Sequence, residues 1–260
     1  MEWLYTTWYG ILIICLLALA VLLILSTLLY RQFFKRFYDI VLSLLAIIVL
    51  SPIFIILIIV GAIVMKGNPF FTQLRPGKKD KNGKEKIFKL IKFRTMTNAK
   101  DKDGNLLPDE KRLVKYGKFL RSTSLDELPE LFNIFIGTMT IIGPRPQLVR
   151  DMVFMTPEQR NRHNVKPGLS GLAQCNGRNE MSWEKKFEYD LKYIENIGLW
   201  FDVGIIFKTI FKVFKREGIT DGEMATAMDY GDYLLENGLI SKDDYSIKQN
   251  EAKKVLNEVK

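Results

Sequence analysis

Cysteine and histidine are almost absent from this sequence of 260 residues, which contains two cysteines and one histidine. Cys15 lies in an apolar stretch and Cys175 stands alone in the more polar remainder, so we expect no intramolecular disulfide framework. The two cysteines and His163 are also too few for a structural zinc site. This composition fits a reducing, cytoplasmic setting.

Charged residues are missing from two long stretches near the start of the chain. Residues 11–29 provide 19 positions without a charge, and residues 40–65 provide 26 more. About 20 apolar residues cover the roughly 30 Å hydrocarbon core of a bilayer, so both stretches are predicted to enter a membrane. The first is too long for the apolar part of a signal peptide and no basic residue precedes it, so we expect it to be retained as a transmembrane helix.

The two apolar stretches conflict over topology unless the second one is broken. Three basic residues between positions 31 and 36 place the end of the first stretch in the cytoplasm. If residues 40–65 then crossed fully, the basic segment beginning at Lys66 would lie outside, against the same rule. Ser51-Pro52 indicates a broken helix that returns to the same face, because proline removes one helix hydrogen bond and the Ser51 hydroxyl can satisfy a freed backbone group. From this pattern alone, a spanning helix with a proline kink is an equal alternative.

The remaining sequence predicts a small domain of helices with one β-hairpin. Residues 68–73 and 87–94 are expected to be extended, joined by a basic, turn-rich loop. Residues 201–216 place apolar side chains on one face and three lysines on another, which is typical of a helix on an anionic bilayer surface. A helix packed on the core with solvated lysines is an equal alternative. Other helices are predicted at residues 111–120, from the central acidic stretch to about 135, and at 182–196.

The net charge of +9 is carried almost entirely by the part of the chain after residue 65. A basic domain beside a bilayer suits anionic headgroups or phosphorylated substrates, although charge alone does not exclude nucleic acid. Residues 217–260 reverse the sign, with ten acids and five lysines. Residues 233–245 weakly resemble a short carboxy-terminal helical pair, which makes this tail a candidate for self-association.

The stretch RSTSLDELPELFN, residues 121–133, holds two adjacent carboxylates, Asp126 and Glu127. Ser124 and Glu127 match a capping box, and Pro129 is tolerated only near a helix start, so both acids are expected in or beside the first turn of a helix. Neighbouring helical residues point about 100° apart, so the two carboxylates can hold different roles. The structural alternative is that they only cap the helix and complement its dipole.

Five motifs, taken together, resemble the bacterial sugar transferases, the monotopic phosphoglycosyl transferases that begin glycan assembly on polyprenyl phosphate. They occur in order and with matching spacing between Phe34 and Phe214. Neither of the two glycine-containing loops among them matches a P-loop or a dinucleotide fingerprint. The motifs are KFRTM (92–96), LRSTSLDELP (120–129), GPRP (143–146), PGLSGLAQ (167–174) and GR (177–178).

The resemblance implies a membrane-anchored, mostly helical α+β protein on the cytoplasmic face of the bacterial inner membrane. It implies transfer of a sugar 1-phosphate from a UDP-sugar to polyprenyl phosphate with release of UMP, without nucleic acid as a partner. The expected parts are a transmembrane helix (1–32), a re-entrant helix broken at Ser51-Pro52 (33–65), a cytoplasmic catalytic domain ending in an interfacial helix (66–216) and the acidic tail (217–260). A homo-oligomer formed through the tail is a further expectation.

The resemblance also implies residue roles. Asp126 would be the nucleophile that forms a covalent intermediate, with Mg²⁺ bound at Asp126 and Glu127. Glu127 would act as a metal ligand or as the base for the incoming lipid phosphate. Carboxylates are ionised at neutral pH and can split one displacement into two, but the diphosphate charge must first be neutralised. The expected phosphate-binding cations are Lys92, Arg94, Arg121 and Arg145, and the residues expected to contact other parts of the donor are Gln174 and Arg178.

Two competing interpretations remain open at this point. One is a non-enzymatic membrane scaffold whose basic body binds anionic lipid or an acidic partner. The other is a metal-dependent hydrolase of lipid diphosphates that uses the same acids. No segment specifies the donor sugar.

Overall fold

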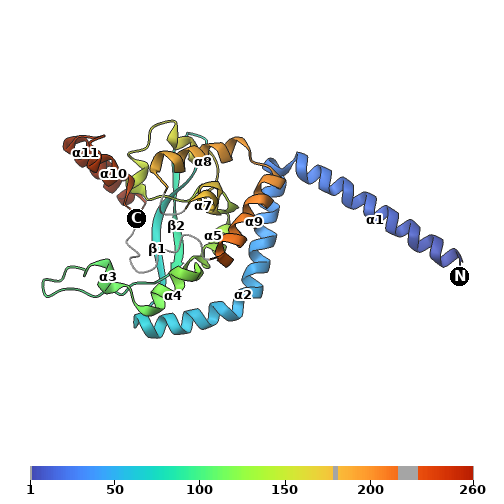
Figure 1. Cartoon of the computed structure of the whole chain (residues 1–260), viewed down its shortest axis with the longest axis horizontal. Coiled ribbons are helices and arrows are strands. Elements are labelled where there is room, and N and C mark those ends of the chain that lie inside the picture. The colour runs from blue at the N-terminus through green and yellow to red at the C-terminus, as the bar shows by residue number, and fades with distance from the viewer. Residues whose placement is uncertain (1, 178–180, 216–227, 260) are drawn as a thin grey trace.

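The computed structural model describes residues 2–177, 181–215 and 228–259, and its fold is mostly helical α+β. Figure 1 shows a body of short helices around a hairpin, with one long helix projecting away from it. In chain order the elements are α1 (Glu2–Leu28), η1 (Tyr30–Phe34), α2 (Lys35–Met65), β1 (Phe70–Lys79), β2 (Glu85–Phe93), α3 (Asp109–Arg112), α4 (Lys115–Thr123), η2 (Leu125–Glu127), α5 (Glu130–Ile136), β3 (Thr140–Ile142), α6 (Val149–Met152), η3 (Gln159–Asn164), β4 (Gly168–Ser170), α7 (Leu172–Asn176), α8 (Trp183–Glu195), α9 (Leu199–Lys215), α10 (Tyr230–Glu236) and α11 (Lys242–Glu258).

The predicted hairpin is confirmed, with β1 antiparallel to β2. The first strand is longer than expected, because it continues through Pro76 to Lys79 and leaves only residues 80–84 as the turn. Both strands of a two-stranded sheet are edge strands, where a missing proline N–H is tolerated. The Asp80 carboxylate accepts the backbone N–H groups of Asn82 and Lys84 and so closes the turn.

The single helix expected at residues 111–120 is wrong, because α3 and α4 are separate. Leu113 and Val114 between them have extended backbone, with ψ of 105° and 163°. Leu113 forms an isolated antiparallel bridge with Met96, which directly follows the hairpin in the chain. A long-range strand contact therefore overrides the local helical pattern.

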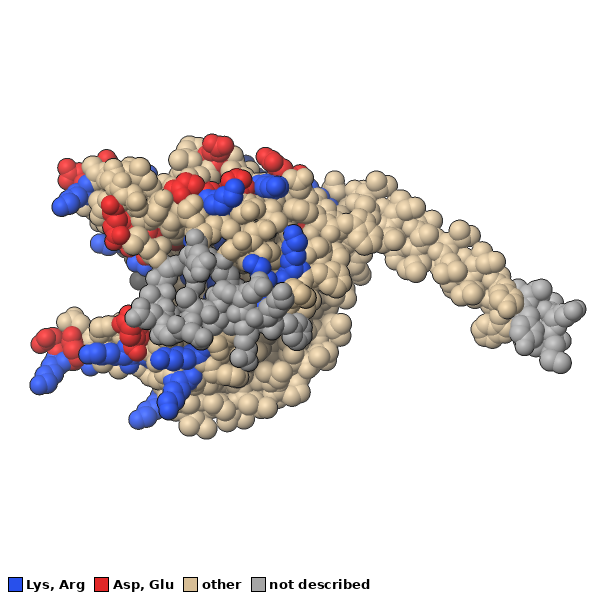
Figure 2. Space-filling view, in the orientation of Figure 1, with Lys and Arg blue, Asp and Glu red and all other residues tan. Residues whose placement is uncertain are grey.

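Helices α1 and α2 are long and apolar enough to cross a membrane, and few of their residues are buried by the rest of the protein. The rest of the protein therefore leaves most of the surface of these two helices exposed. Figure 2 shows charged side chains gathered on the body, whereas the part of the projecting helix whose side chains are described has an uncharged surface. Both observations are consistent with membrane anchoring.

Helix α2 is continuous over 31 residues but bends sharply near its middle (Figure 1). Pro52 lies inside it and has no N–H to donate to the carbonyl of Ile48. The Ser51 hydroxyl donates to that carbonyl instead, at 2.8 Å. The predicted use of Ser51 to satisfy a backbone group left free by Pro52 is confirmed.

Both halves of α2 contact the same body. In the first half, Arg36 donates to the carbonyls of Ile134 and Phe135 at the end of α5, at 2.6 and 2.7 Å. In the second half, the Leu57 carbonyl accepts a hydrogen bond from the Tyr116 hydroxyl of α4 at 2.9 Å. A cation at the carboxyl end of a helix also interacts favourably with its dipole. The two ends of α2 are thus held by neighbouring elements of one compact unit.

The apolar core beneath the site joins α2, the hairpin and α5. Phe54 of α2 packs against Phe93 of β2, with ring centroids 6.0 Å apart, and against Phe132 of α5 at 5.5 Å. Leu120 of α4 and Ile134 of α5 are fully buried in the same cluster. This cluster fixes the positions of the segments on either side of the acidic stretch.

Helix α9 packs on the body along one face, as one of the two alternatives expected, and its contact with a bilayer surface stays a prediction. Ile205 is buried against the body, whereas Phe207 and Phe211 are 68% and 61% exposed. The helix therefore packs along one face and leaves other apolar residues uncovered. The predicted helix at 182–196 is confirmed as α8, with Ser182 as its N-cap accepting the Lys185 N–H.

The described part of the tail forms a helical pair, α10 and α11, that packs on its own body. Tyr230 and Ala252 are buried in a cluster with Trp183 and Met152. The Tyr230 N–H donates to the Asp151 carboxylate at 2.9 Å, which ties the tail to α6. The pair expected from the sequence is present, and self-association through it stays a prediction.

Candidate active site

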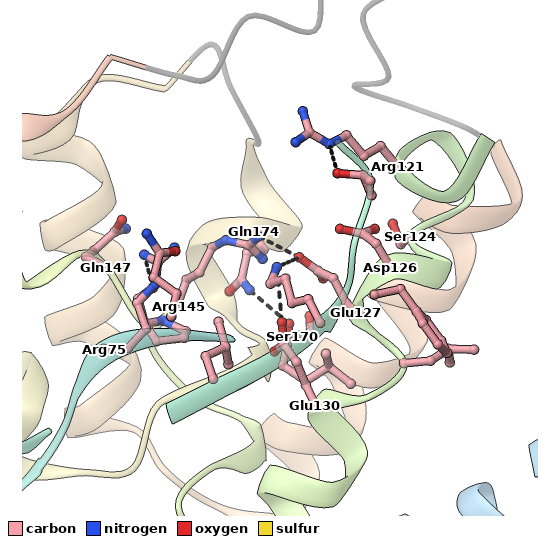
Figure 3. Close-up of a pocket in the computed structure, with 18 of the residues that line it drawn as sticks. Arg75, Arg121, Ser124, Asp126, Glu127, Glu130, Arg145, Gln147, Ser170 and Gln174 are labelled. Carbon is pink, nitrogen blue, oxygen red and sulfur yellow. Dashed lines mark hydrogen bonds and ion pairs between the residues drawn. The ribbon is translucent and has the colours of Figure 1, made fainter. Parts of the chain in front are cut away.

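A pocket brings together residues from five segments that lie far apart in the sequence (Figure 3). It is bounded by the hairpin, the η2 turn, the 143–146 turn, α7 and α9. Arg178 falls outside the described residues, although its neighbour Gly177 lines the pocket. The predicted site residues that line it are Lys92, Arg94, Arg121, Asp126, Glu127, Arg145 and Gln174.

The predicted capping box at Ser124 is wrong. Ser124 ends α4 in the left-handed conformation, with φ 56° and ψ 17°, and its side chain makes no capping hydrogen bond. A non-glycine residue in this region costs roughly 1–2 kcal/mol. The chain reverses direction there, so the two acids lie in the 3₁₀ turn η2, and α5 begins only after Pro129. The Glu127 carboxylate pairs with Lys92 and Arg145, two cations that are remote from it in the sequence, and forms no capping contact with Ser124.

Glu127 is clamped by two cations from other segments. Its Oε1 atom lies 2.8 Å from Lys92 Nζ on β2 and 2.6 Å from Arg145 Nη2. Burial alone would raise the pKa of Glu127, but the charges of Arg145 and Lys92 hold that pKa far below its ordinary value. Glu127 is therefore ionised at neutral pH and keeps both cations directed at the pocket.

Asp126 differs from Glu127 in both contacts and proton affinity. No hydrogen bond or ion pair reaches its carboxylate from the residues that the structure describes (Figure 3). Burial and the neighbouring charge of Glu127 raise the pKa of Asp126 to about 6, against the opposing effect of Lys92, Arg145 and Arg121. Asp126 and Glu127 were expected to hold different roles, and their contacts and pKa values do differ. A carboxylate without partners is free to act as a ligand or nucleophile.

Glu130 is a third acid at the site that the sequence interpretation missed. It is only 3% exposed and lies 3.1 Å from Lys92 Nζ through its Oε1 atom. Burial raises the pKa of Glu130 to about 7, although Lys92 opposes this shift. The available signal was its spacing, since a residue three positions after Glu127 can face the same side of a helical segment.

The 143–146 turn holds Arg145 through contacts with two other segments. The Arg145 carbonyl accepts a hydrogen bond from Arg162 Nη2 at 2.7 Å, and Arg162 is paired with buried Asp190 of α8. The Gly168 N–H donates to the Pro144 carbonyl at 2.9 Å. Pro144 and Pro146 restrict the backbone of the turn, and these two hydrogen bonds hold the turn against other segments. Together they fix the orientation of Arg145.

The glycines of this region permit backbone segments to approach closely. A Cβ atom on Gly168 would lie 2.1 Å from the backbone nitrogen of Gly143. The parallel pair β3–β4 brings these segments together through the register Thr140 with Gly168 and Ile142 with Ser170. The glycine-rich loop thus allows close packing of β4 against the turn that carries Arg145.

The other predicted residues surround the acids. Arg121 is oriented by a hydrogen bond from its Nε to Thr95 Oγ1, at 3.1 Å. Gln174 donates to the Leu169 carbonyl at 3.1 Å, and its Oε1 atom is buried without a partner among the described residues. The tail also reaches the pocket, because Met228 and Asp229 line it.

The donor set allows only one mode of metal binding. No group of three or more His, Cys, Asp or Glu side chains suited to a metal occurs in residues 2–177, 181–215 and 228–259. Mg²⁺ is usually held by one or two carboxylates together with substrate phosphates and water rather than by an all-protein cage. The Asp126–Glu127 pair, with its free Asp126 carboxylate, fits this mode.

Comparison with known proteins adds a family match. A family model described as "Bacterial sugar transferase" matches residues 30–216. An uncharacterized sugar transferase of Bacillus subtilis (strain 168), EpsL, is 44% identical over 193 residues, which cover 74% of this chain and 93% of that protein. The exopolysaccharide production protein ExoY of Sinorhizobium fredii (strain NBRC 101917 / NGR234) is 34% identical, covering 71% of this chain and 87% of that protein.

A larger relative has a more specific name. The UDP-glucose:undecaprenyl-phosphate glucose-1-phosphate transferase of Klebsiella pneumoniae is 42% identical over 191 residues. The match covers 70% of this chain but only 40% of that protein. The shared region ends before the acidic tail in the family match.

Proposed function

Because this chain belongs to the bacterial sugar transferase family, we propose that it transfers a sugar 1-phosphate from a UDP-sugar to undecaprenyl phosphate and releases UMP. The names of relatives support both substrates. The observation that carries the proposal is the Asp126 carboxylate, which has no hydrogen-bond or ion-pair partner among the described residues and lies in a cation-lined pocket beside the clamped Glu127. The product would be the first lipid-linked intermediate of an extracellular glycan.

In the proposed mechanism, Asp126 attacks the phosphorus that carries the sugar. A bond forms between a carboxylate oxygen and this phosphorus, and the bond to the nucleotide phosphate breaks, which releases UMP. An oxygen of undecaprenyl phosphate then attacks the same phosphorus, and the acyl phosphate bond breaks to restore the Asp126 carboxylate. Lys92, Arg121 and Arg145 offset the negative charge that would otherwise repel each anionic nucleophile.

The strongly lowered pKa of Glu127 makes it a weak base, so we propose it as a metal ligand and as the anchor of Lys92 and Arg145. Bound Mg²⁺ would supply charge neutralisation at the diphosphate. Glu130 has a pKa raised to about 7 by burial and suits exchange of a proton near neutral pH. Asp126 would then be the nucleophile, Glu127 a metal ligand and Glu130 a proton donor or acceptor in the same pocket.

We further propose that α2 is re-entrant, which would place the body on the cytoplasmic face of the inner membrane. The support is that Arg36 and Leu57, on the two sides of the Pro52 bend, both contact the same body. Ala46 and Leu50 of α2 also line the pocket that contains Asp126. A lipid phosphate whose tail stays in the bilayer could reach the nucleophile along this wall.

Single cysteines at positions 33 and 80 test this topology. With Cys15 and Cys175 replaced by serine, both positions should react with a membrane-impermeant maleimide from the cytoplasmic side of oriented vesicles. Phe33 is 68% exposed and Asp80 lies in the hairpin turn, so both sites are open to the reagent. Labelling of the two positions from opposite sides would contradict the re-entrant arrangement.

The proposed activity is tested with the full-length protein in lipid nanodiscs. A panel of UDP-sugars should include one donor that gives repeated turnover, with UMP released and sugar phosphate entering the lipid fraction, when undecaprenyl phosphate and Mg²⁺ are both present; without the lipid, UMP release should stop at about one equivalent per protein. The value of kcat/KM should rise with pH and level off above about 6, because the pKa of Asp126 is raised to about 6 by burial and only the ionised carboxylate attacks. A flat profile between pH 5 and 8, or UMP release without lipid product on every donor, counts against the proposal.

A further inference from the structure

Arg75 of β1 lines the pocket, and no carboxylate of the described residues pairs with it. Its Nη1 donates to the Pro146 carbonyl at 3.0 Å and its Nη2 donates to Gln73 Oε1 at 2.7 Å. Its Nε is buried without a hydrogen bond in the described part of the structure. A guanidinium has five N–H donors, and the described residues accept hydrogen bonds from two of its nitrogen atoms.

The electrostatic surroundings of Arg75 are unfavourable as they stand. Among the described residues, no carboxylate forms an ion pair with it, and the nearby charge with the largest effect is that of another cation, Arg145. Burial and Arg145 lower the pKa of Arg75 to about 10, and the acids Asp151, Glu130 and Asp229 only partly oppose this. Placing a cation in a partly buried site without a paired anion is costly. A phosphate group of a bound ligand would supply a matching negative charge there.

The position of Arg75 indicates which anion this is. In Figure 3, the Arg145 side chain lies between Arg75 and the Asp126–Glu127 pair. In a phosphoryl transfer the attacking and leaving oxygens are roughly in line, so the leaving group departs on the side away from the nucleophile. When Asp126 attacks the phosphorus that carries the sugar, the nucleotide phosphate would leave on the opposite side, which is the side of Arg75.

We propose that Arg75 is a further substrate-binding residue, which holds the phosphate of the departing nucleoside monophosphate next to Arg145. This inference rests on the proposed function, because it assumes a nucleotide donor attacked by Asp126. Its link to the Pro146 carbonyl gives Arg75 a second effect, since the same side chain supports the turn that carries Arg145. The purely structural alternative is that Arg75 only supports this turn.

Binding of UMP and of uridine separates these two alternatives, because only UMP carries the phosphate. Isothermal titration of full-length protein in nanodiscs should give a preference for UMP over uridine in the wild type. Arg75→Met should reduce this preference about 10- to 100-fold, in the range expected for a lost charge-assisted hydrogen bond. Arg75→Gln keeps a donor for the Pro146 carbonyl but loses the charge, and it should show the same reduction.

The control is Lys78→Met, which removes a positive charge from an exposed position of the same strand, outside the pocket. It should bind UMP as the wild type does. An unchanged ratio of UMP to uridine affinity in a folded Arg75→Gln or Arg75→Met variant overturns the role of Arg75. Absence of UMP binding by the wild type would instead count against the proposed function itself.

Discussion

Replacing Asp126 by asparagine is expected to abolish sugar-phosphate transfer, with a loss of at least about 10³-fold, as is typical when a covalent nucleophile is removed. The amide has nearly the same shape as the carboxylate but cannot form the acyl phosphate. Stability should be retained, because no hydrogen bond or ion pair to this carboxylate comes from the described residues. The measurement is UMP release together with the thermal unfolding midpoint.

Trapping the intermediate makes the same prediction more specific. A donor labelled in its sugar phosphate should leave label on the wild-type protein when lipid acceptor is omitted, and none on Asp126→Asn. Asp103→Asn, in the exposed 101–105 loop, is a matched control that should label and turn over normally. Turnover by Asp126→Asn at the wild-type rate would remove Asp126 as the nucleophile. Lipid-independent hydrolysis without trapped label would support the hydrolase alternative.

Replacing Lys92 by methionine is expected to destabilise the protein by about 3 kcal/mol, in the range found when one partner of a buried ion pair is removed. The side chains of Lys92, Glu127 and Glu130 are 18%, 18% and 4% exposed, so the two acids would remain largely buried with reduced compensation. Activity should also fall about 100-fold, because the pocket loses a cation and Glu127 loses one of its two anchors. Denaturant unfolding and the transfer assay measure the two effects.

The pH dependence of this destabilisation has a defined sign. The pKa of Glu130 is already raised to about 7 by burial, and Lys92 opposes that rise, so removal of Lys92 raises it further. An acid with a raised pKa in the folded state loses stability as pH rises through that pKa, because the charged form is penalised. Lys92→Met should therefore be more destabilising at pH 8 than at pH 5. Lys89→Met, an exposed position on the same strand, should show neither effect, and an equal loss in both variants would contradict the proposed ion-pair cluster.

Elements that depend on neighbouring residues could be predicted from the sequence. The hairpin, the helix at residues 182–196 and the Ser51 contact across Pro52 all follow from local rules, and the structure confirms them. The split between α3 and α4 could not be predicted in this way, because it depends on the bridge between Leu113 and Met96. Local propensity does not include such a contact.

The acidic stretch shows the same division most clearly. The sequence by itself determined the family, the two long apolar helices and the pair Asp126–Glu127, since each is written in contiguous motifs or in an uninterrupted apolar run. The tertiary structure decided that Glu127 pairs with Lys92 and Arg145, which lie 35 and 18 positions away, rather than with Ser124 three positions away. Charge-assisted contacts in a partly buried site are stronger than an exposed cap, and only folding brings their partners together.

The roles of Glu130 and Arg75 likewise became visible only in three dimensions. The sequence interpretation assigned neither residue a role, yet burial raises the pKa of Glu130, and Arg75 is a partly buried cation without a paired acid in the described structure. The sequence specifies which charges the chain carries. Which of them are desolvated, and which oppose one another, is decided by packing, because the energy of a charge depends on its distance to others and on the water removed around it.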